Sequence, residues 1–109
     1  MDLGLRGKTA IVTGSSMGLG LAVAKELARE GCNVTICSRG EEALFAAQKE
    51  IQAQADGAQV HAVMTDMERS EDINRLVSET VDRFGTVHIL VNNAGTSITK
   101  DFLDVERED

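Results

Sequence analysis

Glycines near the N-terminus have a spacing that could bind phosphate. Residues 13–20 read Thr-Gly-Ser-Ser-Met-Gly-Leu-Gly, between a β-branched apolar run and a stretch of good helix formers. Between a strand and a helix, Gly14 would permit a tight turn and Gly18 would let the backbone approach a pyrophosphate. Gly20 would let the helix pack close to the sheet. Free N–H groups and the helix dipole attract phosphate at such a helix start. We therefore predict a dinucleotide site; the alternative is an ordinary strand-to-helix turn.

Ser38 ends a second β-branched run, at residues 33–38, and Arg39 follows it. In a dinucleotide-binding fold the end of this strand meets the adenosine ribose, where an acid would favour a free 2′-hydroxyl and repel a 2′-phosphate. The Arg39 guanidinium is instead a charged fork suited to phosphate. We therefore predict NADP(H) as the cofactor in preference to NAD(H). The alternative for Arg39 is a solvated loop charge.

Apolar runs and helical stretches alternate along the whole chain. Strands are predicted at residues 9–13, 33–38, 59–64 and 87–91, and helices at 19–30, 41–54 and 70–84. In the last helix Ser70 is predicted as the N-cap, and Gly85 ends it. Its apolar face is predicted from Ile73, Leu76, Val77, Thr80, Val81 and Phe84. The β-α-β-α-β-α-β order predicts an α/β fold, the N-terminal half of a doubly wound parallel (Rossmann) sheet with strand order 3-2-1-4.

Three motifs together resemble those of one enzyme family. Thr-Gly-x-x-x-Gly-x-Gly at residues 13–20, Asp66 after the third strand and Asn-Asn-Ala-Gly at residues 92–95 are similar to the signatures of short-chain dehydrogenases/reductases. The resemblance extends from about Gly7 to the last residue and is greatest to 3-oxoacyl-carrier-protein reductases. It implies that residues 1–109 are the N-terminal part of an NAD(P)-binding Rossmann domain.

The resemblance also implies a set of cofactor contacts. Asp66 would accept a hydrogen bond from the adenine amino group, unless it only caps its strand end. Ser38 occupies the position at which relatives that prefer NAD carry Asp. Met17 occupies the position at which many NADP-using relatives carry a second basic residue. Asn92 would be structural. The complete cofactor-binding set is Gly14, Ser16, Met17, Gly18, Leu19, Ser38, Arg39, Asp66, Met67, Asn93, Ala94 and Gly95.

The implied activity is hydride transfer between the nicotinamide and a small-molecule carbonyl or alcohol substrate. The family uses a Tyr-x-x-x-Lys pair for proton transfer, and this sequence contains no Tyr. No catalytic residue is therefore assigned, and the chain alone is expected to be inactive. The alternative function is a non-catalytic nucleotide-binding or sensing module, which needs no Tyr.

Composition limits the partners of the chain. The 109 residues carry a net charge of −7, which disfavours nucleic acid and anionic membranes. No signal peptide and no run of about 20 apolar residues is present, so we expect a cytoplasmic protein. Cys32 and Cys37 are expected to be buried and unbridged, and His61 and His88 to pack without a metal. The fourth strand would be an apolar edge, so we expect a homo-oligomer or association with a missing C-terminal half.

Overall fold

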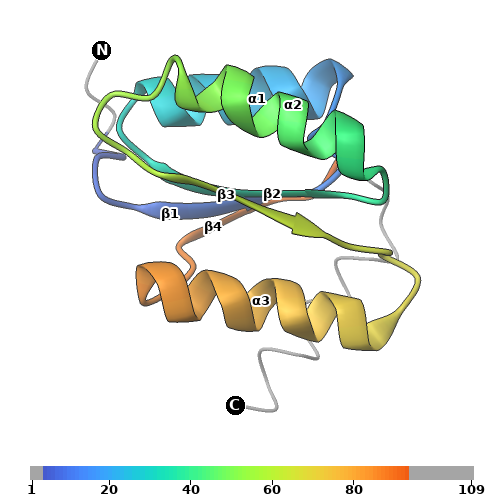
Figure 1. The fold of residues 1–109 in the computed structure, drawn as a ribbon. Helices are drawn as coiled ribbons and strands as arrows, with labels where there is room; N and C mark the ends of the chain where they lie inside the picture. The colour runs from blue at the N-terminus through green and yellow to red at the C-terminus, as the bar shows by residue number, and fades with distance from the viewer. Residues whose placement is uncertain (1–3, 94–109) are drawn as a thin grey trace.

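A computed structural model describes residues 4–93 of the chain (Figure 1). In this range strands and helices alternate in the predicted order. The elements are β1 (Thr9–Val12), α1 (Gly18–Arg29), β2 (Asn33–Ser38), α2 (Glu41–Gln52), β3 (Val60–Met64), α3 (Ser70–Phe84) and β4 (Ile89–Val91). The predicted element types are therefore all confirmed, and most boundaries agree within two residues.

The strands form one parallel sheet in the order β3-β2-β1-β4, as predicted. Helices α1 and α2 cover one face of this sheet and α3 covers the other (Figure 1). The order places β1 and β2 in the middle, so the loops that follow them meet at the carboxyl edge of the sheet. In open α/β sheets this edge is where ligands bind.

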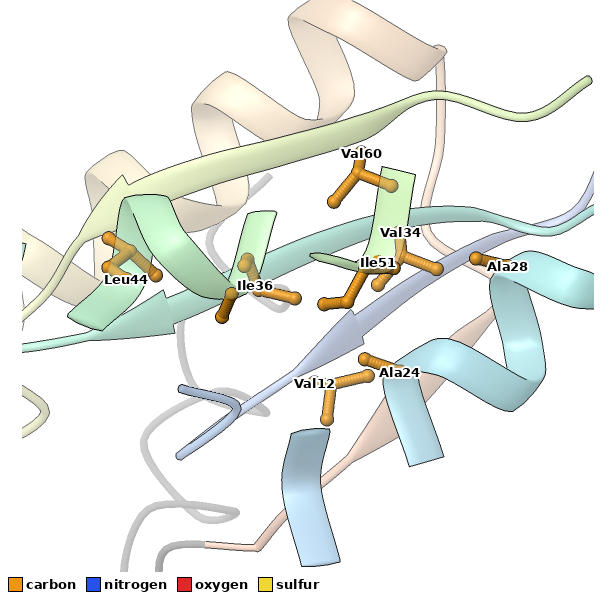
Figure 2. Packing of buried hydrophobic residues seen from close by; sticks show 9 residues of the cluster. Val12, Ala24, Ala28, Val34, Ile36, Leu44, Ile51 and Val60 are labelled. Atoms are coloured by element: carbon orange, nitrogen blue, oxygen red, sulfur yellow. The ribbon is translucent and has the colours of Figure 1, made fainter. Parts of the chain in front are cut away.

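Two hydrophobic clusters hold the helices on the sheet, one on each face. Neighbouring residues of a strand point to opposite faces, so Val12 packs under α1 and α2 whereas Ile11 faces α3. Figure 2 shows the first cluster, in which strand side chains meet helix side chains from α1 and α2. Its buried members are Val12, Ala24, Ala28, Val34, Ile36, Leu44, Ala47, Ile51 and Val60. The inward residues predicted for α2, namely Leu44, Ala47 and Ile51, are thereby confirmed.

The start of α3 differs from the prediction. Ser70 is the first helical residue and Arg69 is the N-cap, without a side-chain capping bond, so the predicted Ser70 cap is wrong. The reason is a tight turn before the helix, closed by a 2.9 Å hydrogen bond from the Arg69 N–H to the Asp66 carbonyl. This turn leaves Arg69 as the last extended residue. The predicted stop at Gly85 is confirmed, with a left-handed φ of 92°.

One member of the predicted apolar face of α3 is exposed. Ile73, Leu76, Val77 and Thr80 are buried, but Val81 is 39% exposed and Phe84 is half-buried. Val81 lies at the margin of the helical stripe, where the sheet no longer covers it. Thr80 is polar but tolerates burial, because its hydroxyl is hydrogen-bonded. The hydroxyl donates to the Leu76 carbonyl at 2.7 Å and lies 3.0 Å from the Thr35 hydroxyl of β2.

Glutamine side chains of α2 cover the free side of β3. The Gln48 amide donates to the Val60 carbonyl at 2.9 Å, and the Gln52 carbonyl oxygen accepts from the Val60 N–H at 3.0 Å. The Gln52 amide also donates to Ala58 at 2.9 Å. These side chains satisfy backbone groups that an edge strand would otherwise present to another chain.

Candidate functional site

The glycine loop has the backbone geometry that its spacing predicts. Gly14 has a φ of 59° and Gly18 a φ of 62°, values that favour glycine. A Cβ on Gly20 would lie 2.3 Å from the Gly14 carbonyl oxygen, so the start of α1 packs directly on the turn. The N-cap Met17 makes no side-chain capping bond, and no acidic residue lies in the first turn of α1. This helix start can therefore accept an anion.

Hydrogen bonds to the strands on either side fix the loop. The buried Ser15 hydroxyl donates to the Val12 carbonyl at 2.7 Å and accepts from the Cys37 N–H at 3.0 Å, which ties the loop to the end of β2. The Thr13 hydroxyl accepts from the Asn93 N–H at 2.9 Å, and the Asn93 amide donates to the Gly14 carbonyl at 3.3 Å. Thr13 was predicted as the last residue of the first strand and the first residue of the motif, and Ser15 as a loop residue, but neither was assigned a contact.

A pocket of about 420 Å³ lies where the glycine loop meets the ends of β2 and β3. Among the predicted residues, the lining includes Gly14, Ser16, Met17, Ser38, Arg39, Asp66 and Met67. Three segments that are distant in the sequence therefore share one cavity. Cys37, Gly40, Ala43, Thr65 and Glu68 also line it. Most of these additional residues adjoin the predicted strand ends, which is the signal that could have found them.

The other predicted residues lie outside this lining. Gly18 and Leu19 begin α1, and the Leu19 side chain is 69% exposed. Asn93 contacts Gly14, and the Asn92 side chain lies 3.3 Å from the Thr13 hydroxyl, which fits its expected structural role. Ala94 and Gly95 fall outside the described residues.

Charges of both signs line the pocket. Arg39 is exposed, and no carboxylate among residues 4–93 forms an ion pair with its guanidinium. The half-buried Asp66 accepts a 3.0 Å hydrogen bond from the Glu68 N–H on its Oδ1 atom. The pocket thus offers a cation at the end of β2 and a carboxylate oriented by backbone at the end of β3. Such a pair can bind an anion and a neutral hydrogen-bond donor in the same ligand.

Both cysteines are free and buried, as predicted. Burial raises the pKa of the Cys37 thiol from 9.0 to about 12 and that of Cys32 to about 11. Cys37 thus contributes an un-ionised, inert wall to the pocket at neutral pH.

We expect alkaline pH to destabilise the chain through these thiols. Well below pH 9 both are protonated in the folded and unfolded states, so they add no pH dependence. From pH 9 to about 12 the unfolded Cys37 ionises while the folded one does not. Each thiol should then lower the free energy of unfolding by about 1.4 kcal/mol per pH unit, Cys32 up to about pH 11 and Cys37 up to about pH 12. Urea unfolding at pH 8, 9 and 10 measures this fall. Cys37→Ala should remove the Cys37 part of this fall and leave the Cys32 part, and an equally steep fall in that variant would contradict the assignment.

The two histidines bind protein groups in the described structure. His61 Nε2 lies 3.0 Å from the Glu79 carboxylate on α3, at the rim of the core. His88 Nδ1 accepts a 3.0 Å hydrogen bond from the Thr9 N–H. Among residues 4–93 no His, Cys, Asp or Glu cluster has metal-binding geometry. No helix in that range is both long and apolar enough to cross a membrane.

Comparison with known proteins agrees with this geometry. The sequence model of the short chain dehydrogenase family matches residues 8–109. A 3-oxoacyl-(acyl-carrier-protein) reductase from Staphylococcus epidermidis is 38% identical over 96 residues, which are 88% of this chain. The structure of L-sorbose reductase from Gluconobacter frateurii, complexed with NADPH and L-sorbose, superposes on 88% of the chain with a TM-score of 0.82 and 38% identity. A variant of actinorhodin polyketide ketoreductase with NADPH gives a TM-score of 0.76 at 38% identity, also over 88% of the chain.

The chain is much shorter than these relatives. It spans 38% of the Staphylococcus reductase and 36% of each of the two solved structures. The expected resemblance to 3-oxoacyl-carrier-protein reductases is confirmed, and it concerns the N-terminal part of those proteins.

Proposed function

This chain belongs to the short-chain dehydrogenase family, and on that basis we propose that it binds NADP(H) as the cofactor-binding part of an oxidoreductase. Residues 1–109 would form the N-terminal part of an NAD(P)-binding Rossmann domain. The observation that carries the proposal is the pocket that joins the glycine loop to Arg39 and Asp66.

The residues of the pocket fit a dinucleotide with a 2′-phosphate. The positive φ of Gly18 and the open space beside it leave room for a ligand against the backbone at the start of α1. At the end of β2, Arg39 would bind the 2′-phosphate with help from the Ser38 hydroxyl. Residue 38 is a serine and not an acid, so no negative charge at this position repels that phosphate. The NADPH of the L-sorbose reductase structure supports the same preference.

The remaining contacts follow the family pattern. Asp66 would accept from the adenine amino group, with the Met67 backbone beside it. Asn93 would line the ribose near the nicotinamide together with Ala94 and Gly95. Gly14, Ser16, Met17 and Leu19 complete the proposed set.

NADPH supplies a hydride, and the proposed substrate is a small molecule with a carbonyl or alcohol group. The chain has no Tyr to serve as the acid of that reaction. Within these 109 residues we therefore propose cofactor binding without turnover. A non-catalytic nucleotide-binding or sensing module is the second candidate, and the absence of Tyr favours it equally. Substrate turnover by a protein that contains this chain separates the two.

We also propose that the chain associates through β4. Among the described residues this strand pairs with β1 alone, and Ile89, Leu90 and Val91 are only half-buried. An apolar edge of this kind can template pairing with a further segment of the protein or with a second copy.

Equilibrium binding to the chain tests the cofactor proposal. NADPH should bind at least about tenfold more tightly than NADH, because one charge-assisted phosphate contact distinguishes them. Adenosine 2′,5′-bisphosphate should compete with NADPH, since the contacts proposed for the pocket are to the adenosine end, whereas nicotinamide mononucleotide should compete poorly. Equal affinity for NADPH and NADH would reject the NADP(H) preference, and no binding of either would reject the function.

A further inference from the structure

The connection between β3 and α3 is held by an acid that lies outside the pocket. Asp72, in the first turn of α3, accepts a 2.8 Å hydrogen bond on its Oδ2 atom from the Asp66 backbone N–H. Its side chain is only 20% exposed. This contact spans six residues and joins the helix to a residue of the pocket wall.

The same turn fixes the direction of the Asp66 carboxylate. The Glu68 N–H donates to Asp66 Oδ1 at 3.0 Å, and the Arg69 N–H donates to the Asp66 carbonyl at 2.9 Å. With Asp72 on the Asp66 N–H, the main chain of Asp66 is held on both sides and one carboxylate oxygen is occupied. Among residues 4–93 no group donates to Asp66 Oδ2, so this oxygen can meet a ligand.

Arg75 lies between Asp72 and the end of β3. Its guanidinium lies 3.8 Å from Asp72 Oδ1 and donates to the Met64 carbonyl at the end of β3. Arg75 also lies 3.7 Å from the Glu79 carboxylate, which contacts His61. The end of β3 and the start of α3 are therefore joined by side chains of α3, and the pocket wall lies between them.

We propose that Asp72 is a positioning residue for adenine recognition, because it fixes the backbone that aims the Asp66 carboxylate into the pocket. The inference rests on the proposed function, in which Asp66 accepts from the adenine amino group. Asp72 touches no ligand in this role. A simpler role would be stabilising α3, since a negative charge near a helix N-terminus is favourable.

The two roles depend on different properties of the side chain. Positioning requires an acceptor oxygen within reach of the Asp66 N–H, whereas the helix effect requires only negative charge. Asp72→Asn retains an acceptor of the same length and loses the charge. Asp72→Glu retains the charge and displaces the oxygens by one methylene. Glu71→Ala is the matched control, because this neighbouring acid is exposed and, among residues 4–93, forms an ion pair with Arg69 alone, at 3.5 Å.

The readout is discrimination between NADPH and its hypoxanthine analogue, which carries a carbonyl in place of the adenine amino group. The unchanged chain should prefer NADPH by about tenfold, the effect of one hydrogen bond to a carboxylate. Asp72→Glu should lose this preference, while Asp72→Asn and Glu71→Ala should keep it. A retained preference in Asp72→Glu, or its loss in Asp72→Asn, would overturn the proposal.

Asp66→Ala separates failure of this inference from failure of the proposed function. If Asp66→Ala loses the preference for NADPH but Asp72→Glu keeps it, Asp66 recognises the adenine amino group without help from Asp72. If Asp66→Ala keeps the preference, the adenine role of Asp66 is itself wrong. Circular dichroism with urea unfolding of each variant shows whether the variant folds. If Asp72→Glu does not fold, Asp72→Asn, the smallest change, still tests the proposal, because loss of the preference in that variant would overturn it.

Discussion

Replacing Gly20 with alanine should lower the free energy of unfolding by about 2 kcal/mol and weaken dinucleotide binding. The added Cβ would lie 2.3 Å from the Gly14 carbonyl oxygen and 3.0 Å from the Asn93 amide. Because the closer of these two contacts is with a backbone atom, the clash can be removed only if α1 moves away from the loop. Such overpacking costs about 3 kcal/mol, and the better helix propensity of alanine offsets about 1 kcal/mol. Urea unfolding and NADPH titration measure the two effects.

Gly40→Ala is the matched control for this clash. Gly40 lines the same pocket, has an ordinary φ of −90°, and a Cβ there would contact nothing within 4 Å. Its replacement should change the unfolding free energy by less than about 1 kcal/mol. Equal urea midpoints for Gly20→Ala and Gly40→Ala would show that α1 does not depend on this close approach.

Replacing Arg39 with alanine should weaken NADPH binding about 10- to 100-fold and leave NADH binding nearly unchanged. A hydrogen-bonded contact with a charged phosphate contributes about 1.5–3 kcal/mol of binding free energy. NADH lacks the 2′-phosphate and does not make this contact, so its affinity should not depend on Arg39. Arg39 pairs with no carboxylate among the described residues, so its removal leaves no buried charge unpaired. Isothermal titration of both dinucleotides measures the two affinities.

Arg69→Ala controls for the general loss of positive charge. Arg69 is also an exposed arginine near this edge of the sheet, but it does not line the pocket and it pairs with Glu71. We expect a uniform, small reduction for both dinucleotides in this variant. The NADP(H) assignment fails if Arg39→Ala lowers NADPH and NADH affinity by the same factor, because Arg39 then acts only through net charge.

The sequence predicted the elements well because local chemistry decides them. The runs around Val34 and Val60 are β-branched and apolar, and Gly85 adopts the left-handed conformation that ends α3. The cap at Ser70 was predicted wrongly because residues outside the helix decided it. The turn closed by Asp66 places Arg69, not Ser70, at the helix boundary. Propensity describes what a residue favours by itself, and here the preceding turn was stronger.

The glycine spacing, Arg39 and Asp66 were all evident in the sequence, which by itself determined the family and the kind of ligand to expect. The tertiary structure alone decided which residues share the pocket and what holds them there. Ser15 joins the glycine loop to β2, and Asp72 holds the backbone of Asp66. Such hydrogen bonds form only when the folded sheet brings the ends of its strands close together. No spacing along the chain specifies those hydrogen bonds, so these supporting residues become visible only once the sheet is assembled.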